Sequence, residues 1–175
     1  MPGWELFDQV AEVVRGSAPT DLGDLHLRVH HNGLKAWFGD PAPAREHYEA
    51  QLVTADIVTA DIVTADIVTA DIVTADIVTD AHAGALEIGF HAEHRAEADN
   101  EAVLTRLLGV RERWQGDLGD EAVAGPFLGR SSWRRVSEVW LDPELEGADV
   151  AFEVGVRLVE YMRALEPLRR VAAEV

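Results

Sequence analysis

The sequence predicts a two-layer α+β domain, in which a mainly antiparallel sheet of about four strands carries helices on one face. Two kinds of segment indicate this class. Segments that alternate apolar and polar residues, typical of strands with one buried face, are interspersed with segments whose apolar residues recur at helical spacing. Five identical copies of Ala-Asp-Ile-Val-Thr (residues 55–79) interrupt an otherwise varied chain. We therefore expect one domain over residues 1–175, with the repeat as an insert and the order α-ββ-α-(repeat)-β-α-β-α.

Before the repeat, the clearest pattern is a hairpin over residues 25–38. Two alternating runs flank Asn32-Gly33, a strong signal for a two-residue turn. The predicted register pairs Arg28 with Trp37 and His30 with Lys35. It collects one apolar face from Leu25, Leu27, Val29, Leu34, Ala36 and Phe38. Helices are predicted on both sides of this hairpin, over residues 5–15 and 44–52.

After the repeat, residues 85–91 are predicted to form a third strand, with Leu86, Ile88 and Phe90 inward and Glu87, Gly89 and His91 outward on a solvated face. Asn100 is predicted to cap one long helix that ends near Gly119. A turn-rich connection over residues 125–129 precedes a fourth strand at 133–140. A final helix, capped by Asp149, reaches about Val171, with an inward set of Phe152, Val156, Val159, Met162 and Leu165.

The repeat has a five-residue period, which gives a fixed apolar face on neither a helix nor a strand. Ala-Asp-Ile-Val-Thr resembles the unit of the pentapeptide-repeat family, which winds into a square β-solenoid. The resemblance covers 25 residues, little more than one coil of such a solenoid. A passive insert, a helix continuing from the preceding segment, a solenoid turn and a self-association element are the four interpretations left open.

Composition excludes several functional classes. With 15 Lys and Arg against 32 Asp and Glu, the net charge of −17 argues against binding to nucleic acid or to an anionic membrane surface. The lack of cysteine excludes disulfides and thiolate metal sites. No apolar stretch reaches the length of a membrane span, and the first residues do not read as a signal peptide. We therefore expect a cytoplasmic protein. Its composition is typical of bacteria with GC-rich genomes, since Lys35 is the one lysine beside 14 arginines.

From the third strand onward the chain resembles a bacterial domain family of unknown function, some of whose members carry restriction-endonuclease-like modules. The matching residues are Leu86-Glu87-Ile88-Gly89-Phe90, Asn100-Glu101, Leu104, Leu107, Leu108, Leu118-Gly119, Trp133-Arg134-Arg135-Val136 and Leu165-Glu166-Pro167-Leu168. The resemblance spans residues 85–170 and implies an α+β accessory domain. It carries over no catalytic residue.

Catalytic motifs are incomplete. A nuclease of the PD-(D/E)xK type needs a lysine where this sequence has Gly89. The Gly-x-Ser-x-Gly elbow of a serine hydrolase is missing. His91-Ala92-Glu93-His94 offers metal-ligand types, but a His-x-x-His spacing at a strand end directs the two rings apart. We therefore predict no catalytic residue, metal or other cofactor, and keep a metal-dependent hydrolase using Glu87, His91, Glu93 and His94 as the alternative.

The outward face of the hairpin is the predicted functional surface. Arg28 and Trp37 are expected to form a cation–π pair flanked by His30 and Lys35. Glu87 and His91 join this face if the third strand lies beside the hairpin. A cationic and aromatic surface on an acidic protein favours an anionic small ligand or an acidic protein segment. The sequence thus predicts a non-catalytic binding or interaction domain, with metal-dependent hydrolysis and repeat-mediated self-association as alternatives.

Overall fold

The computed structural model describes residues 3–54, 84–127, 129–141, 143–145, 147 and 149–171. This part of the chain is an α+β domain with one antiparallel sheet of six strands, in the order β1-β2-β3-β4-β6-β5. The α+β class is confirmed, and the sheet has two more strands than the four expected. In chain order the elements are α1 (Gly3–Ser17), a 3-10 helix (Thr20–Leu22), β1 (Leu25–His30), β2 (Gly33–Phe38), β3 (Glu46–Thr54), β4 (Gly84–Ala92), α3 (Glu97–Leu108), α4 (Arg111–Leu118), β5 (Val123–Phe127), β6 (Arg130–Leu141) and α5 (Val150–Val171).

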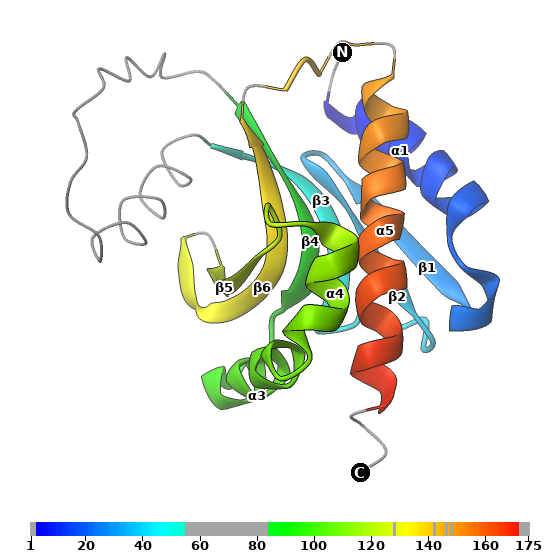
Figure 1. The fold of residues 1–175 in the computed structure, drawn as a ribbon. Helices are drawn as coiled ribbons and strands as arrows, with labels where there is room; N and C mark the ends of the chain where they lie inside the picture. The colour runs from blue at the N-terminus through cyan, green and yellow to red at the C-terminus, as the bar shows by residue number, and fades with distance from the viewer. Residues whose placement is uncertain are drawn as a thin grey trace, which may run out of the picture.

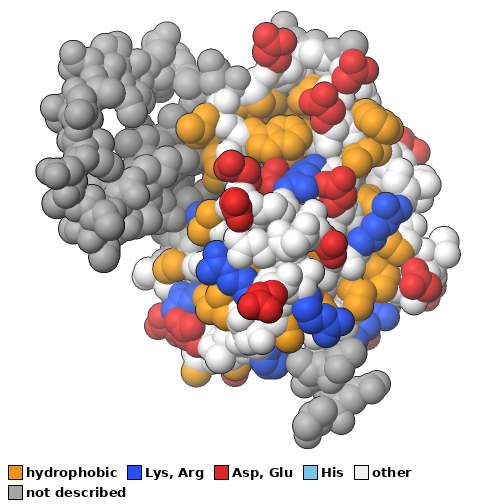
Figure 2. All heavy atoms as spheres, in the orientation of Figure 1, with side chains coloured by type: hydrophobic (Ala, Val, Ile, Leu, Met, Phe, Trp, Pro, Cys, Tyr) orange, Lys and Arg blue, Asp and Glu red, His pale blue; other side chains and the backbone are white. Residues whose placement is uncertain are grey.

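The long helix α5 crosses the middle of the sheet, with α1 on one side and α4 on the other (Figure 1). Their apolar side chains and one face of the sheet form a single core, which includes Phe7, Tyr48, Phe90, Trp114 and Met162. Gly155 lets α1 and α5 approach closely, since a Cβ at this position would lie 2.6 Å from Cγ1 of Val13. Figure 2 views this helical side, where acidic and basic side chains are interspersed with apolar ones.

The first hairpin forms with a different register from the predicted one. Its two-residue turn is His31-Asn32, and Arg28 lies opposite Lys35 while His26 lies opposite Trp37. The shift is two residues, so each side chain keeps its predicted face. Gly33 explains the difference: it is a strand residue, and a Cβ there would lie 2.7 Å from the His30 ring and 2.8 Å from the Ala50 carbonyl oxygen.

Residues 46–54 form a central strand, so the helix predicted over residues 44–52 is wrong. β3 pairs with β2 on one side and β4 on the other. Tyr48 and Ala50 are buried in the core on the helical side, and the alternate residues His47 and Glu49 are buried too. Such a strand is buried on both faces. In the sequence alone, its charged residues look like those on the solvent-exposed face of a helix, which is why the sequence predicts a helix there.

The long helix predicted after Asn100 is two helices that meet near Gly109. Trp114 is buried and its indole nitrogen donates to the Leu107 carbonyl oxygen, which satisfies an acceptor at the end of α3. Asn100 lies within α3 and does not cap it: its side chain binds the backbone of His94 and Ser132. The predicted turn at residues 125–129 is largely strand β5.

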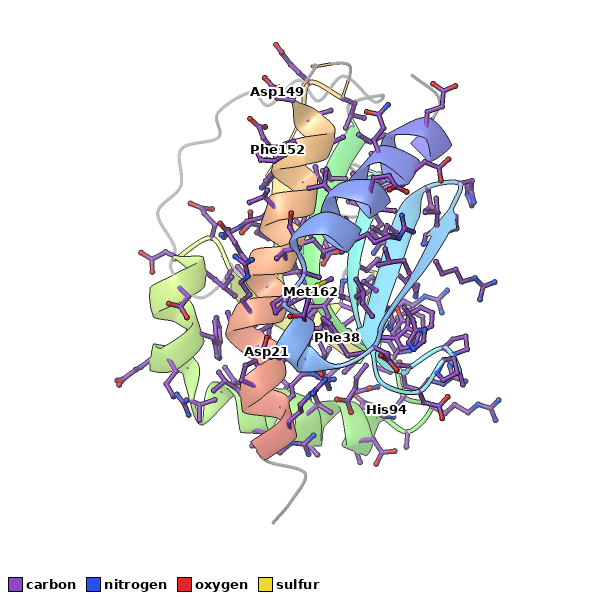
Figure 3. All side chains as sticks on the ribbon, turned by 90° about the vertical axis from the view of Figure 1, so that its right-hand side faces the viewer. Asp21, Phe38, His94, Asp149, Phe152 and Met162 are labelled. Carbon is purple, nitrogen blue, oxygen red and sulfur yellow. The ribbon has the colours of Figure 1, made fainter. Side chains whose placement is uncertain are left out.

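The final helix is close to its predicted bounds, but its buried face is partly different. Val159, Met162 and Leu165 are buried as predicted, together with Val154 and Leu158. Figure 3 shows Met162 in the middle of α5 and Asp149 and Phe152 at its first turn. Phe152 is 61% exposed, so its predicted inward position is wrong. None of the described helices is long and apolar enough to cross a membrane. The repeat and its four interpretations lie outside the described residues.

Candidate functional site

The face of the sheet that points away from the helices carries a buried polar cluster. Glu49, Glu87 and His91 are 0–2% exposed, so the prediction that the third strand turns a solvated side outward is wrong. The alternation of the strands places these residues opposite the core positions, and β3 lies between the hairpin and β4. Phe127 of β5 covers part of the cluster, with its ring edge-on to His91 at a centroid distance of 4.7 Å.

Two His-x-Glu segments on paired strands form the centre of this cluster. His47 and Glu49 come from β3, while His91 and Glu93 come from the end of β4 and the residue after it. His47 and His91 are direct partners in the antiparallel ladder. One ligand atom from each of the four residues lies within 4.8 Å of the others, a spacing that could hold a metal ion.

The individual distances between these ligand atoms are short. Glu49 Oε2 lies 3.0 Å from His91 Nδ1 and 3.3 Å from His47 Nε2. Glu93 Oε1 lies 3.6 Å from His47 Nε2 and 4.0 Å from His91 Nδ1. Ligand atoms of a tetrahedral Zn²⁺ site, with bonds of about 2.0–2.1 Å, lie about 3.3 Å apart. The four residues are therefore close to the spacing that such an ion requires.

Each of the two imidazoles is oriented by an acceptor on its outer side. His47 Nδ1 lies 3.2 Å from the Ala44 carbonyl oxygen, which can only accept, so this nitrogen carries a proton and Nε2 faces the cluster. His91 Nε2 lies 2.8 and 2.9 Å from the two carboxylate oxygens of Glu87 and donates to them. Its Nδ1 therefore faces Glu49. Metal-bound histidines in proteins are oriented by outer acceptors in the same way.

Burial and the carboxylates set the charge states. Burial alone lowers the pKa of His91, but Glu87 and Glu49 raise it to about 9. Burial also lowers the pKa of His47, with a smaller opposing effect of Glu49, so this imidazole is neutral at pH 7. Burial opposes ionisation of Glu49, yet hydrogen bonds from His30 and His91 hold its pKa well below the usual range. At pH 7 Glu49 is thus ionised, His47 is neutral and His91 is protonated.

Lys35 and His30 lie on the side of the cluster that is open to solvent. Their side chains are 30% and 28% exposed, whereas that of Glu93 is 12% exposed. Lys35 Nζ lies 3.3 Å from Glu49 Oε2 and 3.2 Å from Glu93 Oε2. His30 Nε2 lies 3.2 Å from the other oxygen of Glu49, and this hydrogen bond raises its pKa.

The predicted binding residues fall into two groups. His30, Lys35, Glu87 and His91 belong to this cluster, although β3 separates the hairpin from β4. The predicted Arg28–Trp37 pair is not formed: Trp37 stacks on His26 at 5.7 Å and its indole nitrogen donates to the Asp40 carbonyl oxygen. Arg28 is exposed.

His94, a member of the predicted hydrolase set, lies apart from the cluster. Its Nε2 contacts Glu46 at 2.9 Å, and Figure 3 shows it beyond the end of the sheet. The sequence prediction missed His47 and Glu49. The signal that could have revealed them is the repeated His-x-Glu spacing, at residues 47–49 and 91–93. Comparisons of the chain with protein-family models, with curated proteins and with solved structures find no match, so the resemblance to the bacterial family stays a prediction.

Proposed function

We propose that this chain is a binding domain for a divalent transition-metal ion, held by His47 Nε2, Glu49, His91 Nδ1 and Glu93. The observation that supports this function most is the orientation of the two imidazoles. Their outer nitrogens donate to the Ala44 carbonyl oxygen and to the Glu87 carboxylate, so the remaining nitrogens face Glu49 and Glu93. At His91 an ion would take the place of the proton shared with Glu49, as metals commonly displace ligand protons.

The donor set indicates the class of metal. Two imidazole nitrogens and two carboxylate oxygens suit Zn²⁺ and its first-row neighbours, whereas Mg²⁺ prefers six oxygen ligands in octahedral geometry. Two neutral imidazoles and two carboxylates also balance the charge of a divalent ion. Zn²⁺ is therefore the first ion to test.

The number of protein ligands supports binding over hydrolysis. A catalytic zinc site keeps one coordination position for water or substrate, whereas four protein ligands complete a tetrahedral structural site. The predicted alternative of a metal-dependent hydrolase shares His91 and Glu93 with this proposal, but His94 pairs with Glu46 instead. We therefore retain the non-catalytic class and assign the ion a binding role between β3 and β4.

The test is a titration of chelator-stripped protein with Zn²⁺ by isothermal calorimetry. We expect one equivalent to bind, and we expect His47→Ala and Glu93→Gln each to weaken binding by more than about tenfold, because each removes one ligand atom. Bound ion should also raise the melting temperature. At a free Zn²⁺ concentration 100 times Kd, binding adds about 2.7 kcal/mol to the free energy of unfolding.

His94→Ala is the matched control, since it removes a histidine next in sequence to Glu93 but outside the cluster. Its Zn²⁺ affinity should equal that of the unmodified chain. Melting curves of the stripped variants exclude loss of binding through unfolding. The proposal fails if the unmodified chain binds no Zn²⁺, or if His94→Ala weakens binding as much as His47→Ala does.

A further inference from the structure

We propose that Lys35 is a built-in competitor for the metal, whose ammonium group must leave the site before the ion enters. This inference rests on the proposed function and describes how its affinity is regulated. Lys35 Nζ contacts oxygen atoms of two proposed ligands, Glu49 and Glu93. Of the two, Glu49 Oε2 is also the oxygen that faces both imidazoles. The ammonium group therefore pairs with the same two carboxylates that the ion would bind.

The competition follows from charge. Like charges at separations of a few ångströms repel strongly where the surroundings are poorly solvated, and Glu49 is almost fully buried. An ion bound to Glu49 and Glu93 would remove the favourable partners of Lys35 and place a divalent cation beside it. Binding of the ion therefore costs the free energy of the contacts that Lys35 makes in the metal-free protein, and this cost lowers the affinity for the ion.

The position of Lys35 allows it to leave. Its side chain is 30% exposed, on the open side of the cluster, so a change of rotamer can carry the ammonium group into water. The buried ligands His47 and His91 lie deeper and need not move with it. Lys35 thus acts as a tethered cation, which neutralises the carboxylates until a more highly charged ion replaces it.

The test compares Lys35→Met with Arg28→Met by calorimetric titration with Zn²⁺. Arg28 lies directly opposite Lys35 in the β1–β2 ladder and is exposed, so its substitution removes the same charge one strand further from the ligands. We expect Lys35→Met to bind Zn²⁺ about tenfold more tightly than the unmodified chain, and Arg28→Met to change Kd by less than about threefold.

Melting temperatures of the metal-free and the zinc-bound proteins supply a second readout. Without metal, Lys35→Met should melt below the unmodified chain, because Glu49 and Glu93 lose a partner. With saturating Zn²⁺ it should gain more stability from the ion than the unmodified chain gains. Equal or weaker Zn²⁺ binding by Lys35→Met overturns the competitor role while leaving the metal site intact. Failure of the unmodified chain to bind Zn²⁺ overturns the metal site itself.

Discussion

Glu87 is a fully buried carboxylate that makes no contact with the proposed ion and yet orients one of its ligands. Hydrogen bonds from His91 and Gln51 reach its two oxygens, and Ser137 is a further partner. Burial alone would raise the pKa of Glu87, but His91, Ser137 and the charge of Arg135 hold it below its usual range, so the group stays ionised. A charged acceptor at His91 Nε2 makes the opposite nitrogen a stronger metal ligand.

We expect Glu87→Gln to weaken Zn²⁺ binding by about 10- to 100-fold, although all four ligands remain. The matched control is Glu138→Gln, a second buried carboxylate that binds Arg157 and Tyr161 on the helical side of the sheet. Both substitutions should lower the melting temperature, but only the first should change Kd. Equal Zn²⁺ affinity of Glu87→Gln and the unmodified chain would contradict an orienting role for Glu87.

At the scale of single elements, the packing of α1 against α5 depends on Gly155. A methyl group there would lie 2.6 and 2.7 Å from the side chain of Val13. We expect Gly155→Ala to destabilise the fold by about 1–3 kcal/mol, because overpacking costs more than the helix propensity of alanine returns. Urea denaturation measures the change.

Gly116→Ala is the matched control for the helix propensity of alanine. Gly116 lies in α4, and a methyl group added there would meet no described neighbour within 4 Å beyond its own helix, so alanine should stabilise the fold by about 0.5–1 kcal/mol. The two substitutions are thus expected to have opposite signs. A stabilised Gly155→Ala protein would show that α1 and α5 do not pack as closely as described.

The elements that the sequence predicted well are those with one apolar face. Leu86, Ile88 and Phe90 alternate with polar residues, and all three are buried in the core as expected. β3 was predicted incorrectly because a buried glutamate and an exposed one look alike in sequence. Glu49 is buried only because His30, Lys35, His47 and His91 surround it, and those contacts involve several different strands.

The site was accordingly predicted in part. The alternation of the strands predicts the shared face of His30, Lys35, Glu87 and His91, and the fold preserves that face even though the hairpin register is shifted by two residues. His47 and Glu49 are missing from the predicted site because their segment is predicted as a helix, whereas it forms β3. Local patterns identify the face of a side chain, whereas the partners on neighbouring strands decide whether a polar residue there is solvated or held in a cluster.

At the scale of the whole molecule, the two ends of the segment outside the described residues meet in the sheet. Thr54 and Gly84 are direct partners in the β3–β4 ladder. We expect replacement of residues 55–83 by Asn-Gly to preserve the fold, because a two-residue turn can join paired antiparallel strands and a shorter loop costs less closure entropy. The melting temperature should not fall, and Zn²⁺ binding should be unchanged.

Light scattering on the same shortened chain tests the predicted self-association through the repeat. An unchanged mass with an unchanged melt supports a passive insert. A lower mass, or a collapse of the melt, would show that residues 55–83 contribute to assembly or to stability.

The β3–β4 ladder also places the repeat-bearing segment and the histidine pair at opposite ends. It runs from Thr54 opposite Gly84 to Glu46 opposite Ala92, and the histidine pair lies next to the second of these ends. Fraying that starts at Thr54 must open the pairs through Ala50 and Ile88 before it reaches Glu49. A change in the number of five-residue copies would therefore alter the length of the chain at the end of this ladder that lies away from Glu49 and the histidine pair.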